Sequence, residues 1–170
     1  MAKFIFLRLM GWRIEGDFPP LKKFILSVFP HTRSMDFIVG ILTRAVLKEK
    51  INYVGKKELF NPITSWFFRA LGGAPINRGS NENKVSAIAK IFNEKKTFRM
   101  AIAPEGTRKK VDRWKTGFYF IAMEAKVPIL LVHFNYPSKK VSFLKLFYPT
   151  GDIEMDLKKI KGYYNLAEHE

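Results

Sequence analysis

The chain has 170 residues, of which 47% are apolar, and this composition is that of a folded protein with a core rather than a disordered tail. Its 30 lysines and arginines against 15 acidic residues give a formal net charge of +15, which attracts polyanions such as nucleic acids or anionic lipids. The absence of cysteine excludes disulfides, thiolate nucleophiles and cysteine-ligated metal sites. We expect a single domain over residues 1–170.

Residues 1–13 are mostly apolar, but Lys3, Arg8 and Arg13 interrupt them. The segment is far shorter than the ~20 apolar residues that span a bilayer, and it lacks the small-residue cleavage site of a signal peptide. Two interpretations stay open. The segment forms an interfacial helix whose basic side chains reach toward lipid headgroups, or it forms a helix that packs on the domain core.

Apolar runs and helical spacings alternate along the rest of the chain. Strands are expected at 24–29, 51–54, 74–76, 97–103 and 127–134, helices at 34–47, 63–71, 84–93 and 117–125, and further β-rich segments at 141–148 and 151–155. This order predicts an α/β fold, a single domain with a mixed, mostly parallel sheet flanked by helices. Ligands of such sheets gather beyond the C-terminal ends of strands.

A histidine and an aspartate lie five residues apart where the first of these strands turns into a helix. His31 leaves the strand and Asp36 lies in the first turn of the helix, so the carboxylate can reach back to the imidazole. A carboxylate in that position fixes the tautomer of a histidine and stabilises its protonated form, as general-base catalysis requires. Taken alone, the pair is also explained by an aspartate that caps the helix.

Two more segments follow expected strands and are rich in groups that bind phosphate. The first places Glu105, Gly106, Thr107 and Arg108 directly after a strand, and the second ends in Arg78. Exposed backbone at glycine together with a guanidinium is typical of a phosphate site. Each segment alone is equally compatible with a surface turn that carries a solvated arginine.

Four segments taken in order resemble the motifs of the glycerolipid acyltransferases, the lysophosphatidic acid or PlsC-like family. They are HTRSMD at 31–36, GGAPINR at 72–78, APEGTR at 103–108 and the pair Val127-Pro128, and the match extends over about residues 24–152. Many members of the family have asparagine before the histidine. Pro30 stands there in this chain, which resembles a bacterial subgroup with a Pro-His-Thr start.

The resemblance assigns roles to individual residues. It implies that His31 and Asp36 are catalytic and that Val127-Pro128 closes the pocket. The substrate-binding residues that it implies are Arg78, Glu105, Gly106, Thr107 and Arg108, with the two arginines on the acceptor phosphate. It implies no metal and no cofactor, with acyl-CoA or acyl-carrier protein as the co-substrate.

The implied activity is transfer of a fatty-acyl group from a thioester of CoA or acyl-carrier protein to the hydroxyl of a lysophospholipid or a glycerol-phosphate-type acceptor, in phospholipid synthesis. The implied partners are the acyl donor, the lysolipid and an anionic membrane surface, without specific nucleic acid. The implied location is peripheral, on the cytoplasmic face of a membrane.

Two alternatives to this function remain. The first is a basic nucleic-acid- or membrane-binding protein without catalysis, although no known nucleic-acid motif is present. The second is a thioester hydrolase, although no G-x-S-x-G elbow is present.

Several other residues are candidates for structural roles. Trp66, Phe67 and Phe68 are expected in the core or along an acyl groove. His133 and His169 have no carboxylate at a useful spacing, and we interpret them as structural or incidental. The basic run over residues 108–115 is either a solvated face or a surface that attracts substrate.

Overall fold

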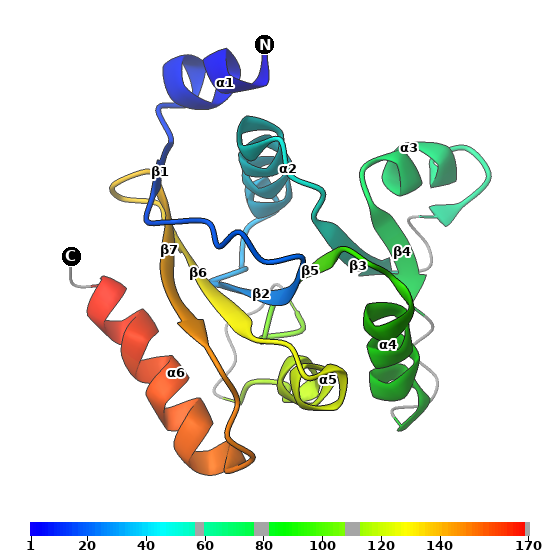
Figure 1. Cartoon of the computed structure of the whole chain (residues 1–170). Coiled ribbons are helices and arrows are strands. Elements are labelled where there is room, and N and C mark those ends of the chain that lie inside the picture. The colour runs from blue at the N-terminus through cyan, green and yellow to red at the C-terminus, as the bar shows by residue number, and fades with distance from the viewer. Residues whose placement is uncertain (57–59, 77–81, 108–112, 169–170) are drawn as a thin grey trace.

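The protein is described here by a computed structural model, which covers residues 1–56, 60–76, 82–107 and 113–168. A seven-stranded sheet lies between two layers of helices (Figure 1). Helices α1, α2 and α3 lie above the sheet in this view, and α4, α5 and α6 lie below it. The α/β prediction, with a mostly parallel mixed sheet, is therefore confirmed.

The strand order is β1-β7-β6-β2-β5-β3-β4. The bounds are β1 Arg13–Glu15, β2 Lys23–Phe29, β3 Asn52–Lys56, β4 Gly73–Ile76, β5 Phe98–Ile102, β6 Ile129–Asn135 and β7 Lys140–Phe147. All neighbouring pairs are parallel except β6 and β7, which form an antiparallel pair. The central strands β6, β2 and β5 therefore end at the same edge of the sheet.

The central strands are apolar on both faces because both faces are covered by helices. In β2, Phe24 and Leu26 belong to the cluster on the α2 side, and Ile25 belongs to the cluster on the α5 and α6 side. Strand β6 alternates in the same way. This burial, at roughly 25 cal/mol per Å² of apolar area, holds the central strands in register and fixes the ends from which the site is built.

The helices follow most of the expected ranges. Their bounds are α1 Ala2–Phe4, α2 Met35–Leu47, α3 Ser65–Ala70, α4 Glu82–Glu94, α5 Gly117–Ala125 and α6 Ile153–Glu168, and α1 continues into a π-helical stretch, η1, over Ile5–Leu9. Helix α2 packs through Val39 and Thr43 and ends at Lys48, which has a left-handed backbone conformation. Among the described residues, no helix has both the length and the apolar character needed to cross a membrane.

The expected β-rich segment at 151–155 is wrong, because helix α6 begins there. Asp152 accepts a hydrogen bond from the N–H of Met155 at 3.0 Å, which starts the helix. Ile160, Tyr164 and Ala167 are buried at helical spacing against the sheet. Five residues at the start of a helix can resemble a strand when the longer 3.6-residue period that follows is not considered.

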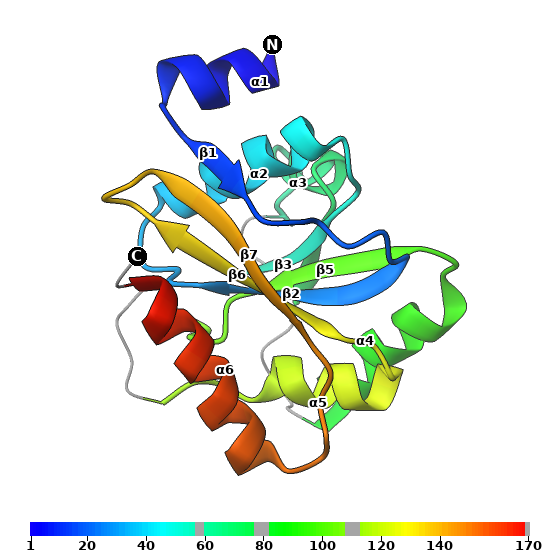
Figure 2. The same ribbon diagram turned by 60° about the vertical axis from the view of Figure 1, so that its left-hand side comes forward.

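The N-terminal segment divides its apolar side chains between the core and the surface. Phe6 and Trp12 are buried in the cluster on the α2 side. Phe4 and Leu9 are exposed. Figure 2 shows the segment at the end of the molecule where α2 and α3 also lie. The core-packed interpretation is therefore correct for one side of the segment, and the interfacial interpretation remains open for the other.

A buried carboxylate ties α6 to the rest of the domain. Asp156 is fully buried and accepts hydrogen bonds from the Tyr119 hydroxyl at 2.8 Å, the Thr150 N–H at 2.6 Å and the Thr150 hydroxyl at 3.0 Å. Burial alone would raise the pKa of Asp156, but these hydrogen bonds and the charge of Lys159 outweigh it, so the pKa lies below its ordinary value. Asp156 thus contributes stability at neutral pH that is lost as the pH falls through its lowered pKa.

We expect Asp156→Ala to reduce the free energy of unfolding at pH 7 by about 2–4 kcal/mol, since it leaves the buried Tyr119 hydroxyl and the two Thr150 donors without their acceptor. Urea denaturation measures the change. Asp152→Ala is the matched control, since it removes one exposed helix cap and costs about 1 kcal/mol. Equal losses in the two variants would contradict a special role for Asp156. The difference between wild type and Asp156→Ala should also shrink in acid, where the carboxylate is protonated.

Candidate active site

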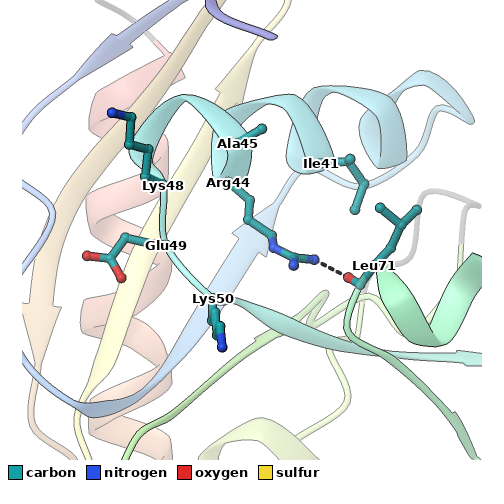
Figure 3. Close-up of a pocket in the computed structure, with 7 residues that line it drawn as sticks. All are labelled: Ile41, Arg44, Ala45, Lys48, Glu49, Lys50 and Leu71. Carbon is teal, nitrogen blue, oxygen red and sulfur yellow. Dashed lines mark hydrogen bonds between the residues drawn. The ribbon is translucent and has the colours of Figure 1, made fainter.

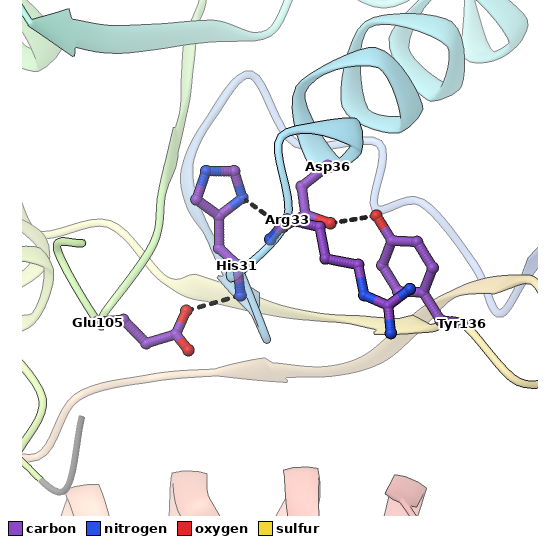
Figure 4. Close-up of polar contacts among 5 residues, drawn as sticks. All are labelled: His31, Arg33, Asp36, Glu105 and Tyr136. Atoms are coloured by element: carbon purple, nitrogen blue, oxygen red, sulfur yellow. Dashed lines mark hydrogen bonds and ion pairs between the residues drawn. The ribbon is translucent and has the colours of Figure 1, made fainter. Parts of the chain in front are cut away.

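The candidate site lies where three neighbouring central strands end. Strand β2 leads into His31, β5 leads into the loop that holds Glu105, and β6 leads into Tyr136. Because β2 is parallel to both neighbours, the side chains that follow these strands meet at one edge of the sheet. Figure 4 shows His31, Arg33, Asp36, Glu105 and Tyr136 gathered there.

The imidazole of His31 faces the carboxylate of Asp36. The distance from His31 Nδ1 to Asp36 Oδ2 is 3.4 Å, and the histidine side chain is 30% exposed whereas that of Asp36 is fully buried. Asp36 lies in the first turn of α2, so the helix fixes where its carboxylate points. With Nδ1 turned to the aspartate, Nε2 lies on the far side of the ring and is the nitrogen that can meet a substrate.

Two more groups bind the Asp36 carboxylate. The N–H of Arg33 donates to Oδ2 at 2.7 Å, and the hydroxyl of Tyr136 donates to Oδ1. The first turn of α2 therefore uses Asp36 to satisfy a backbone donor in the preceding loop, while Ser34, the capping residue of α2, makes no side-chain cap bond. The capping alternative is partly correct: Asp36 supports the loop, and it also faces His31.

Glu105 holds the histidine loop from the opposite side. Its Oε2 accepts a hydrogen bond from the His31 N–H at 2.6 Å, and the side chain is buried. Burial raises the pKa of Glu105, the His31 N–H lowers it, and the negative charge of Asp36 raises it further. The structure thus places this residue, expected in the acceptor site, against the backbone of the loop that holds His31.

Gly106 allows the tight turn that carries Glu105. It has a φ of +63°, which glycine adopts without strain, and a Cβ there would lie 2.5 Å from the Lys115 side chain. Thr107 follows and is exposed. Arg78 and Arg108, together with Lys109 and Lys110, lie outside the described residues, so their predicted phosphate contacts stay predictions.

The expectation that Val127-Pro128 closes the pocket is wrong. Both residues precede β6 and therefore lie at the opposite edge of the sheet from His31. Val127 is buried in the core, and the Pro128 carbonyl accepts a hydrogen bond from the Ile25 N–H at 3.0 Å. The pair is an element of the core, since a buried valine and a proline begin the strand next to β2.

The aromatic residues of α3 differ in burial from one another, and one of the two remaining histidines is buried. Trp66 is 71% exposed and Phe67 is 47% exposed, so a core role for these two is wrong, whereas Phe68 packs 6.0 Å from Phe37 between ring centroids. His133 is buried in β6, which agrees with a structural role. His169 lies outside the described residues.

A separate hollow of about 310 Å³ lies at the other end of α2 (Figure 3). Its lining residues are Ile41, Arg44, Ala45, Lys48, Glu49, Lys50 and Leu71. Two of its charged groups are already paired, since the Arg44 guanidinium donates to the Leu71 carbonyl and Glu49 accepts from Arg99. Within the described ranges, no group of three histidine, aspartate or glutamate side chains is placed to hold a metal ion.

The site at His31 can therefore perform general-base chemistry. A histidine that is partly exposed at one nitrogen and faces a buried carboxylate at the other can take a proton from a substrate hydroxyl. Sequence reasoning found His31, Asp36 and Glu105 but missed Tyr136. Tyr136 can be found from the sheet order, because it follows β6 and β6 pairs with β2, the strand that leads into His31.

Residues 13–134 match the family model named Acyltransferase, which is well over half of the chain. The chain belongs to the acyltransferase family. The matched region includes β2, the loops that hold His31, Asp36 and Glu105, and β6 up to Phe134. The His31–Asp36 pair thus lies in an acyltransferase domain. The search of curated proteins gives no significant match to the sequence.

A solved structure shows the fold of this acyltransferase in another protein. The crystal structure of the 1-acyl-sn-glycerophosphate (LPA) acyltransferase PlsC from Thermotoga maritima superposes with a TM-score of 0.70. The alignment covers 99% of this chain and 75% of the other at 23% identity. The two proteins share one fold.

Asp36→Asn separates a catalytic from a capping role in this acyltransferase. An amide preserves the shape and can still accept the Arg33 N–H, so a cap would survive, but it cannot stabilise a protonated His31. We expect turnover to fall by about two to four orders of magnitude while the unfolding midpoint changes little. Steady-state thiol release and thermal unfolding provide the two readouts. Near-normal turnover in the folded variant would assign Asp36 to capping alone.

Proposed function

We propose that this acyltransferase moves a fatty-acyl group from a thioester of CoA or acyl-carrier protein to the hydroxyl of a lysophospholipid or glycerol-phosphate-type acceptor. The observation that carries the proposal is the His31–Asp36 pair at the sheet edge, with Nδ1 and Oδ2 at 3.4 Å, in a chain of this family. The shared fold with an LPA acyltransferase and the arginine-containing motifs at 72–78 and 103–108 favour a phosphate-bearing lipid as acceptor.

In the proposed reaction, His31 Nε2 removes the proton of the acceptor hydroxyl as its oxygen attacks the thioester carbonyl. The C–O bond of the ester forms, the C–S bond breaks, and the thiolate receives the proton from the imidazolium. Asp36 stabilises the positive charge on His31 between the two proton transfers. The step needs no covalent enzyme intermediate.

We assign the acceptor phosphate to Arg78 and Arg108 on the strength of the sequence motifs. A guanidinium binds two phosphate oxygens at once, which orients the acceptor as well as attracting it. A fixed phosphate brings the hydroxyl into line with His31 and the thioester carbonyl. Thr107, next to Arg108 and exposed at the end of the described loop, belongs to the same proposed site.

Peripheral contact with an anionic membrane is the proposed setting of the reaction. The helical layer that contains α2 also carries exposed apolar side chains at Phe4, Leu9, Ile63 and Trp66. The net charge of +15 adds attraction for anionic headgroups. Because a lysolipid resides in the membrane, this face would bring the acceptor to the start of α2, where His31 and Asp36 lie.

We expect His31→Ala to lower turnover by about two to four orders of magnitude, the usual contribution of a positioned general base. Mass spectrometry of the acylated product, with one acyl-CoA donor and a panel of lysolipids, measures the activity and also identifies the acceptor. His169→Ala is the matched histidine control and should retain wild-type activity.

The same assay tests the hydrolase alternative. Acyl transfer requires that thiol release depend on the lysolipid and that it yield the diacyl product. Thiol release with free fatty acid as the product, unchanged by acceptor, would replace the proposed transferase with a hydrolase. A folded His31→Ala variant with normal turnover would remove the proposed mechanism.

Arg78→Ala and Arg108→Ala should each raise the acceptor KM by about tenfold or more with little change in the donor KM, because each loses a charge-assisted hydrogen bond to phosphate. Lysine at either position should rescue only part of the loss, since an ammonium lacks the planar two-pronged geometry. Lys158→Ala, on the exposed face of α6, is the matched charge control. A rise in the donor KM alone would move the two arginines to the phosphates of the donor.

A further inference from the structure

Tyr136 completes the set of groups around the Asp36 carboxylate. Its hydroxyl donates to Oδ1, while Oδ2 accepts the Arg33 N–H at 2.7 Å and lies 3.4 Å from His31 Nδ1 (Figure 4). The two oxygens therefore have different tasks. One is held by the tyrosine, and the other is shared between the loop backbone and the histidine.

Hydrogen bonds must set the orientation of this carboxylate, because the terminal torsion of an aspartate has broad, roughly two-fold preferences. The Asp36 side chain is fully buried, so solvent cannot supply the missing partners. The Arg33 N–H alone would leave Oδ1 without a donor among the contacts described. With the Tyr136 hydroxyl in place, both oxygens are fixed and Oδ2 stays turned toward His31.

The ring of Tyr136 is itself held on two sides. The Trp12 ring meets it edge-on at 5.0 Å between centroids, and the Arg33 guanidinium lies 4.2 Å from its centroid. Its backbone follows β6 directly, and β6 pairs with β2 so that His133 lies opposite Phe29. The position of the hydroxyl is thus determined by the sheet, the N-terminal segment and the histidine loop together.

The hydroxyl acts as a donor over the working pH range. Burial raises the pKa of Tyr136, and the hydrogen bond to Asp36 and the Asp36 charge raise it further, while Arg33 lowers it by less. A tyrosine that keeps its proton does not serve as the general base. It can only donate to the carboxylate.

We propose that Tyr136 is a positioning residue for acyl transfer, which holds Asp36 Oδ1 so that Oδ2 orients His31 and stabilises its protonated form. The inference rests on the proposed role of His31 as the general base. The charged groups that face this pair in the described part of the chain are Arg33 and Glu105.

Tyr136→Phe tests the proposal, since it removes the hydroxyl and keeps the ring between Trp12 and Arg33. We expect kcat to fall about tenfold, the effect of one hydrogen bond to a charged group, with both KM values within about twofold of wild type. Tyr148→Phe, at an exposed tyrosine, is the matched control and should change none of these values.

A double variant tests whether Tyr136 affects turnover through Asp36. If Tyr136 acts through that carboxylate, Asp36→Asn/Tyr136→Phe should be no slower than Asp36→Asn alone. The comparison of kcat between Asp36→Asn and the double variant remains valid if Tyr136→Phe alone lowers the stability of the fold. A further tenfold loss in the double variant would overturn the proposal, as would a rise in acceptor KM without a change in kcat.

A measurement without substrate separates this inference from the proposed function. The proton NMR signals of the His31 ring, assigned with His31→Ala, should shift in Tyr136→Phe and stay at their wild-type positions in Tyr148→Phe, because only the first change frees the Asp36 carboxylate that faces the ring. Unchanged His31 signals and an unchanged kcat in Tyr136→Phe would refute the role of Tyr136 and leave His31 as the base. Full activity of His31→Ala would instead refute the proposed mechanism, whatever the NMR spectrum of Tyr136→Phe shows.

Discussion

The buried carboxylate of Asp36 is the constraint on which the site depends. A buried charge is costly unless hydrogen bonds and opposite charges surround it, so its neighbours have to be placed by the fold. The Arg33 N–H, the Tyr136 hydroxyl and His31 come from two different loops, and Glu105 holds the histidine loop from a third. The site is thus a network in which each polar group has a structural as well as a chemical task.

The sheet brings these loops together. Strands β6, β2 and β5 are buried on both faces, and their parallel register ends them at one edge. A displaced strand would expose part of the apolar core, so the core that stabilises the domain also fixes the separation of His31 from Glu105 and Tyr136. The His31 side chain is left 30% exposed, which the proposed general base needs in order to meet a substrate.

The two helical layers differ in what they present to solvent. Helix α6 is tied down by Asp156, Tyr119 and Thr150, so the layer below the sheet is anchored by a buried polar cluster. The layer above the sheet carries exposed apolar side chains on the N-terminal segment and on α3. Trp12 connects that layer to the site, because it packs in the core and contacts the ring of Tyr136.

The sequence by itself determined the α/β alternation, the positions of most elements and the pairing of His31 with Asp36, because these depend on local periodicity and on residues five apart. It misassigned residues 151–155, where Ile153 and Met155 alternate with acidic residues at the start of a helix, and the family resemblance placed Val127-Pro128 at the wrong edge of the sheet. Only the tertiary structure decided that Glu105 binds the His31 backbone, 74 residues away, and that Tyr136 binds Asp36 from 100 residues away. Such contacts follow from the order in which strands pair, and strand order is set by burial of the whole core rather than by any local pattern.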